Sequence, residues 1–208
     1  MPRDQLGQPR REILRQLALA TTALSAGVFN IEAARVVHAL AGEARTQLGS
    51  YDPVELTVHE FRTVSRLAEL IVPADDRGGS AVDAGAPEFI DLLCSQNEQL
   101  ASIYRNGITW LDDVMRTRHK LAFVDARDTE QTQMLDNLVE AERGRGPRNI
   151  RVGVDFFAWV RRMTVDAYYT SPIGIADIGF QGNKVLSTYT TPSDVVAFVN
   201  KAADDLGL

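Results

Sequence analysis

The spacing of apolar residues predicts a helix in the stretch that begins at Val58. Apolar side chains recur there three or four positions apart, so they fall on one face of a helix. They are Val58, Phe61, Val64, Leu67 and Ile71. Thr57 and Glu60 match a capping box at the start of the stretch, and Pro73 cannot continue a helix. The pattern therefore predicts a helix that begins at Val58 and ends before Pro73.

The same spacing, together with start and stop signals, predicts helices over most of the remaining chain. They are expected over residues 88–95, 98–122, 128–144, 152–169 and 192–206. Pro87 suits the first turn of one helix, Asp128 begins a second capping sequence, and Thr191 can cap the last helix. Residues 170–190 are rich in Gly, Pro and Ser and are expected to form an ordered loop. No pair of strands shows clear alternation, so the predicted fold class is all-α, a single helical bundle-like domain with long ordered loops.

The N-terminal segment differs in character from the rest of the chain. Arg10 and Arg11 precede an apolar stretch of thirteen residues, Leu17 to Phe29. At ~1.5 Å per residue, a helix of that length is too short for the ~30 Å hydrocarbon core of a membrane. It fits the apolar region of a secretory signal. Residues 9–15 resemble a twin-arginine export signal, with departures from the preferred residues at two positions.

These features divide the chain into three parts. An Ala-x-Ala processing sequence follows the apolar stretch, at Ala39-Leu40-Ala41. Residues 1–41 are therefore interpreted as a twin-arginine signal segment. Residues 42–56 contain Gly and Pro breakers and are interpreted as a linker. Residues 57–208 form the helical domain. The alternative for the N-terminus is an ordinary amphipathic helix with a chance pair of arginines.

Net charge and cysteine content exclude several classes of protein. The formal net charge is −6 and the isoelectric point is about 5.1. This argues against nucleic acid as a partner, because phosphate binding needs a positive surface. Cys94 is the single cysteine. It excludes an internal disulfide, a four-cysteine zinc site, a cysteine-ligated iron–sulfur cluster and a c-type haem attachment. Cys94 follows two leucines, so we expect a buried thiol rather than a nucleophile.

Two pairs of adjacent aspartates are the clearest candidates for chemistry. Asp75 and Asp76 follow Pro73, and such a pair can bind a cation or act as acid and base. More often an Asp pair after Pro caps a turn. Asp112 and Asp113 are neighbours on a predicted helix and do not share a face, so we expect one solvated edge. A catalytic Asp75 or Asp76 would make the chain a stand-alone periplasmic enzyme, which is one alternative function.

Other catalytic and binding motifs are absent from the sequence. His38, His59 and His119 have no partner at metal-ligand spacing. There is no G-x-S-x-G and no G-x-G-x-x-G. We therefore expect no catalytic, cofactor-binding or metal-binding residue in this chain, which favours an accessory or binding role. A periplasmic helical protein that binds a small ligand near Trp110 or Trp159 is the second alternative.

Two blocks of sequence carry a family resemblance. The first consists of residues 67–76, Leu-Ala-Glu-Leu-Ile-Val-Pro-Ala-Asp-Asp, followed by residues 84–91, Ala-Gly-Ala-Pro-Glu-Phe-Ile-Asp. The second begins at Phe156 and ends with residues 178–182, Ile-Gly-Phe-Gln-Gly. Together the blocks span most of the chain after the linker. In this order they resemble the gluconate 2-dehydrogenase subunit 3 family.

The resemblance implies a role that explains the missing motifs. Members of this family are small subunits of flavin-dependent dehydrogenases of sugars, polyols and sugar acids. FAD is then expected in a flavoprotein large subunit, and a cytochrome c subunit often accepts the electrons. The chain would bind the large subunit, help it to mature, and carry it through the twin-arginine translocase. The expected location is the periplasm, with the complex either free or attached to the membrane.

The resemblance also suggests where the large subunit binds. The loop at residues 73–87 and the loop at residues 171–182 are expected to meet on one side of the domain. Apolar side chains left exposed on a monomer often mark an interface. The candidate interface residues are Pro73, Asp75, Asp76, Pro87, Phe89, Tyr168, Pro172, Ile173, Ile178 and Phe180. The alternative is that both loops pack back onto their own helices.

Overall fold

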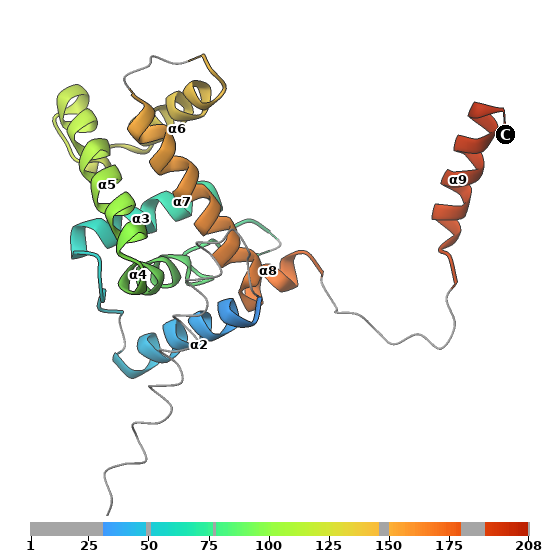
Figure 1. Cartoon of the computed structure of the whole chain (residues 1–208), viewed down its shortest axis with the longest axis horizontal. Helices are drawn as coiled ribbons and strands as arrows, with labels where there is room; N and C mark the ends of the chain where they lie inside the picture. Colours follow the sequence, from blue (N-terminus) through green and yellow to red (C-terminus); the bar gives the residue numbers. More distant parts are fainter. Residues whose placement is uncertain (1–30, 49–50, 77, 146–149, 180–189, 208) are drawn as a thin grey trace, which may run out of the picture.

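The fold is all-α, as the sequence predicts. The computed structural model describes residues 31–48, 51–76, 78–145, 150–179 and 190–207. Within these ranges the regular elements are helices and one 3₁₀ turn, with no strand. In chain order they are α2 (Ile31–Leu48), α3 (Val58–Ile71), α4 (Ala86–Gln96), α5 (Glu98–His119), η1 (Phe123–Asp125), α6 (Asp128–Glu142), α7 (Arg151–Thr170), α8 (Pro172–Asp177) and α9 (Ser193–Leu206). Figure 1 shows their arrangement.

Helix α3 begins and ends where its sequence signals place it. The Thr57 hydroxyl accepts a hydrogen bond from the backbone N–H of Glu60, at 3.3 Å. In return the Glu60 carboxylate accepts one from the backbone N–H of Thr57, at 2.8 Å. The predicted capping box is therefore present. The helix ends at Ile71, two residues before Pro73.

Two predicted capping residues differ from those in the structure by one position. Helix α6 is capped at Arg127 rather than Asp128, because the Glu130 carboxylate accepts the backbone N–H of Arg127 at 3.1 Å. Helix α9 begins after Pro192, and no side chain caps it, so Thr191 does not act as the N-cap. Both differences are shifts of one residue at a helix end, where local signals overlap.

A short helix, α8, lies inside the stretch that the sequence predicts as loop. The Ser171 hydroxyl accepts the backbone N–H of Gly174 at 3.0 Å and so caps its first turn. Pro172 occupies the first helical position, where its missing N–H costs nothing. Gly174 allows close approach, since a Cβ there would lie 2.1 Å from the Tyr168 carbonyl oxygen. The turn from α7 into α8 is thus sharp and ordered.

Helix α7 is the centre of the domain. It contacts α2, α3, α4, α5, α6 and α8 (Figure 1). Its buried stripe includes Phe156, Val160, Met163 and Ala167, which recur three or four positions apart. The largest fully buried side chains around it come mainly from α4 and α5. They include Phe89, Ile90, Leu93, Tyr104, Ile108 and Leu111.

Helices α5 and α7 pack through two reciprocal glycine–aromatic contacts. The Phe156 ring on α7 lies against Gly107 on α5, where a Cβ would be 2.1 Å from the ring. The Trp110 ring on α5 lies against Gly153 on α7, where a Cβ would be 2.0 Å from the ring. Each glycine therefore makes the space that a ring from the opposite helix fills.

Helix α2 belongs to the core although the sequence places it at the end of the signal segment. It runs without a break across positions 41 and 42, where the signal and linker were expected to meet. Ala34, Val37 and Ala41 are buried, and the helix contacts α4 and α7. The latter half of the expected linker, residues 51–56, is bound to α4 through Asp91.

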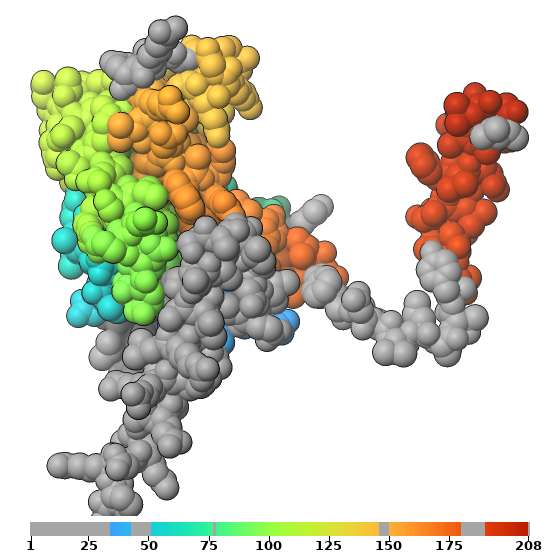
Figure 2. Space-filling model, in the orientation of Figure 1, coloured from blue at the N-terminus to red at the C-terminus, as the bar shows by residue number. Residues whose placement is uncertain are grey.

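Helix α9 stands apart from the other helices (Figures 1 and 2). None of its residues is buried. Its exposed apolar side chains are Val195, Val196, Phe198, Val199 and Leu206. No helix in the described part of the chain is both long enough and apolar enough to cross a membrane.

Candidate functional site

The first candidate loop is held by its own hydrogen bonds. The Asp75 carboxylate accepts the backbone N–H of Gly78 at 2.9 Å, and the Asp75 N–H donates to the Gly78 carbonyl at 3.1 Å. The Ala81 N–H donates to the Val72 carbonyl at 2.9 Å, which closes the base of the loop. Asp75 and Asp76 are exposed. The geometry therefore favours the turn-capping interpretation of Asp75 over a catalytic one.

The two candidate loops meet, as the sequence analysis expected. Gly78 of the first loop lies against Asp177, which belongs to the second loop, and against Tyr168 near the end of α7. A Cβ on Gly78 would be 2.9 Å from the Tyr168 hydroxyl and 3.6 Å from Asp177 Oδ1. A side chain at position 78 would therefore displace the Tyr168 hydroxyl.

A cavity of about 510 Å³ opens where these loops meet α2. Its lining includes Arg35, His38, Asp83, Thr170, Pro172 and Ile175. His38 Nε2 lies 3.1 Å from the Thr170 hydroxyl, so a hydrogen bond joins α2 to the end of α7. The His38 ring also packs on Phe89, with ring centroids 4.9 Å apart. The cavity is therefore formed by three segments that are distant in the sequence.

The burial of His38 makes the stability of this region depend on pH. Burial lowers the pKa of His38, and a backbone contact at Ala167 partly opposes this. The unfolded chain, with a histidine pKa of about 6.5, then takes up the proton more readily than the folded chain. The stability that the neutral His38 contributes is present in full above the pKa of the unfolded chain. It is lost as the pH falls through that pKa towards the lower pKa of the folded chain.

We expect His38→Gln to flatten this pH dependence. Between about pH 7.5 and pH 5.5, the free energy of unfolding should fall more for the natural chain than for the variant. Urea unfolding followed by circular dichroism measures both. Equal falls for the two proteins would contradict the expectation, and His119→Gln provides a control for a histidine outside the cavity.

The candidate interface residues fall into three groups. Pro73, Asp75, Asp76, Pro172 and Ile178 are exposed, and Ile173 is half-buried. Pro87, Phe89 and Tyr168 are buried within the chain's own core. Because these three side chains are buried, they are not part of the interface proposed below. Phe180 and the two signal arginines, Arg10 and Arg11, lie outside the described residues.

Asp91 is a key polar residue that the sequence analysis missed. Its carboxylate is fully buried and accepts four hydrogen bonds. One oxygen accepts from the Tyr51 hydroxyl and the Val54 N–H, each at 2.7 Å. The other accepts from the N–H groups of Glu55, at 3.1 Å, and Leu56, at 2.7 Å. The signal available in the sequence was an acidic residue on the apolar stretch of α4.

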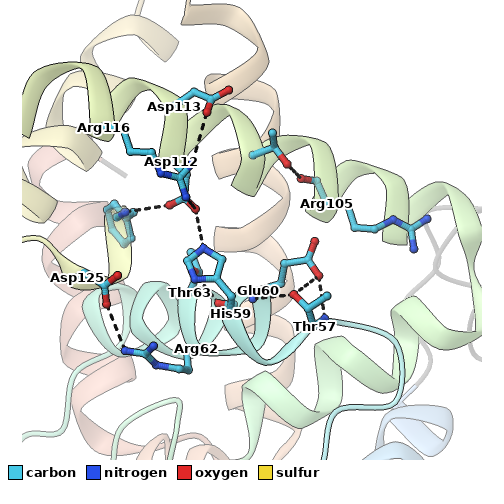
Figure 3. A network of polar contacts seen from close by, with 12 residues as sticks. Thr57, His59, Glu60, Arg62, Thr63, Arg105, Asp112, Asp113, Arg116 and Asp125 are labelled. Atoms are coloured by element: carbon cyan, nitrogen blue, oxygen red, sulfur yellow. Dashed lines mark hydrogen bonds and ion pairs between the residues drawn. The ribbon is translucent and has the colours of Figure 1, made fainter. Parts of the chain in front are cut away.

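Asp112 is also buried, so its predicted place on a solvated edge is wrong. Asp112 is 3% exposed, whereas Asp113 is exposed. Asp112 Oδ2 lies 2.6 Å from His59 Nε2 on α3, and Asp112 Oδ1 accepts the Phe123 N–H at 2.9 Å (Figure 3). Arg116 adds an ion pair at 3.2 Å. The cluster ties α3, α5 and η1 together and has a structural role.

The remaining candidates for chemistry are occupied in packing. Cys94 is buried, as predicted, and burial raises the pKa of its thiol, which disfavours the reactive thiolate. Trp110 packs on Gly153, and neither Trp110 nor Trp159 lines the cavity described above. No group of three or more His, Cys, Asp or Glu side chains in the described ranges is placed to hold a metal ion.

These features define a small all-α protein with two ordered loops and a cavity on one side of a helical core. The chain belongs to the gluconate 2-dehydrogenase subunit 3 family, whose sequence model matches residues 58–186. The match begins at the first residue of α3, so α2 and α9 lie outside it. No significant match was found among curated proteins or among solved structures. The family name indicates that the chain is a subunit of a multi-subunit dehydrogenase complex.

Proposed function

We propose that this chain is the non-catalytic small subunit of a periplasmic FAD-dependent dehydrogenase of sugars, polyols or sugar acids. It binds the flavoprotein large subunit, aids its maturation and carries it through twin-arginine export. The observation that carries the proposal is the family match over residues 58–186, because it identifies the chain as one component of a dehydrogenase. The missing dinucleotide-binding motif supports placing FAD in the large subunit. A cytochrome c subunit is the proposed electron acceptor.

The proposed contact with the large subunit is the surface at α8 and the neighbouring loop. Ile178 at the end of α8 is 56% exposed, and Tyr169 at the end of α7 is 43% exposed. The exposed acidic pair Asp75 and Asp76 lies on the adjacent loop. Exposed apolar side chains on elements that also carry exposed charges are an ordinary composition of a protein–protein interface.

The first experiment tests the function itself. The chain, tagged at its C-terminus, is purified from periplasmic and membrane fractions of its host. We expect a larger protein to co-purify with the visible absorbance of a flavin and with dye-linked dehydrogenase activity on a sugar, polyol or sugar acid. A colourless chain that purifies alone from both fractions would contradict the proposed function.

The second experiment tests the proposed surface. Ile178→Asp replaces an exposed apolar side chain with a charged one, so folding should be unchanged. We expect co-purification of the flavoprotein to fall by about tenfold, equivalent to about 1.4 kcal/mol of binding free energy.

Leu121→Asp is the matched control, because Leu121 is 44% exposed and follows α5 rather than α8. This variant should retain the flavoprotein at the natural level. If Ile178→Asp also retains it, the proposed surface is wrong even where the first experiment supports the function.

A further inference from the structure

Helix α2 contributes a continuous apolar face to the core of the domain. Ala34 is 3% exposed, Val37 is 0% and Ala41 is 4%. Their spacing of three and four residues puts them on one side of the helix. That side contacts α4 and α7, and Ala34 and Val37 belong to the main hydrophobic cluster. The packing of α2 is therefore that of a core helix.

A polar contact fixes the helix in the same position. His38 lies on α2 beside the buried face and is hydrogen-bonded to Thr170, 132 residues further along the chain. Its ring packs on Phe89 of α4. Removal of this part of α2 would take away one wall of the cavity and uncover Phe89 and Thr170.

These contacts bear on the Ala39-Leu40-Ala41 sequence. A processing peptidase binds its substrate as an extended chain and needs the small residues at both alanine positions. In the folded chain these residues lie within an unbroken helix, and Ala41 is buried in the wall of the cavity. A cut after Ala41 would require the helix to open and its apolar face to leave the core.

We infer that residues 31–41 remain in the mature protein, so that any removal of the leader occurs before Ile31. The inference rests on the proposed function only in assuming that the leader directs export. It changes the meaning of the Ala39-Leu40-Ala41 sequence from a processing site to part of a core helix.

The test in the cell uses the full chain with its flavoprotein. The exported chain is purified, and its intact mass and N-terminal sequence are determined. We expect the mature chain to begin at Ile31 or earlier, and a mature chain that begins at any later residue, such as Gly42, would overturn the inference. Ala39→Asp sharpens the result, because aspartate at the first alanine position would block processing there. We expect it to leave the N-terminus unchanged, whereas a longer product would overturn the inference.

A test on the purified full chain is independent of export. Trypsin can cut after Arg35 in α2 and after Arg162 in the central helix α7, and both side chains are exposed. If α2 is a core element, both bonds are protected by the fold and should be cut at rates within about tenfold of each other. Cleavage after Arg35 that is far faster than cleavage after Arg162 would overturn the inference.

Two variants provide the matched comparison for this test. Val37→Asp buries a charge in the core face and should speed cleavage after Arg35 by about tenfold or more, whereas Ala39→Asp on the exposed side should not. Equal acceleration by the two variants would contradict the burial argument. Retention of the natural chain in the cytoplasm would contradict the proposed export and leave the proteolysis result to decide the inference.

Discussion

Replacing Asp91 with alanine should lower the free energy of unfolding by about 3–5 kcal/mol. The carboxylate is fully buried and accepts four hydrogen bonds, three of them from backbone N–H groups of residues 54–56. An alanine leaves these donors without their acceptor, and each buried unsatisfied donor costs about 1–3 kcal/mol. The segment between α2 and α3 also loses its attachment to α4.

Asp91→Asn should be nearly as harmful, although asparagine has the same shape. Each carboxylate oxygen accepts from two donors, so the amide NH₂ of asparagine would face two N–H or O–H groups wherever it is placed. Asp136→Asn is the control, because Asp136 is exposed on α6 and should change stability by less than about 0.5 kcal/mol. Urea unfolding by circular dichroism measures all three variants. An Asp91→Asn protein as stable as the control would show that the carboxylate is dispensable.

Replacing Gly107 with alanine should lower the free energy of unfolding by about 3 kcal/mol. The new Cβ would lie 2.1 Å from the Phe156 ring, which is itself buried between helices. Helix α5 would have to move away from α7, or the ring would have to leave its place. The gain in helix propensity from glycine to alanine, ~1 kcal/mol, is too small to offset this. Gly153→Ala should behave in the same way, because its Cβ would meet the Trp110 ring at 2.0 Å.

Gly42→Ala separates the packing effect from helix propensity. Gly42 lies within α2, and a Cβ there would meet nothing within 4 Å. This substitution should therefore stabilise the chain by up to ~1 kcal/mol. A smaller side chain at position 156 should also relieve the clash with the new Cβ at position 107. The double variant Gly107→Ala with Phe156→Leu should therefore show a coupling energy of about 1 kcal/mol or more. Additive effects of these two substitutions would mean that the glycine and the ring do not act as a pair.

The helices of residues 57–170 were predictable because their signals are local. Thr57 and Glu60 cap α3 in the predicted manner, and α4, α5 and α7 begin within two residues of their expected starts. Spacing of apolar residues and capping depend on neighbours within one or two turns. The family was also recognisable, since both sequence blocks lie within the matched residues.

The polar core and the role of α2 were not predictable in this way. Asp112 was expected in solvent because it adjoins Asp113, yet its partners His59 and Phe123 lie on other elements. Asp91 binds residues 35 to 40 positions away. In the candidate interface, local spacing likewise did not show that Ile178 is exposed and Tyr168 is buried. Whether a polar or aromatic residue is buried depends on which distant segments of the chain pack against it, and the local spacing of residues does not show this.

The sequence by itself determined that this protein is all-α, where most of its helices lie, and to which family it belongs. These properties follow from periodicity, capping residues and motif order, each of which is written within short stretches of chain. Only the tertiary structure decided that α2 is part of the core, that Asp91 and Asp112 are structural, and that the two family loops meet beside a cavity. Burial is the physical reason, because a side chain loses water only when segments distant in the sequence pack against it.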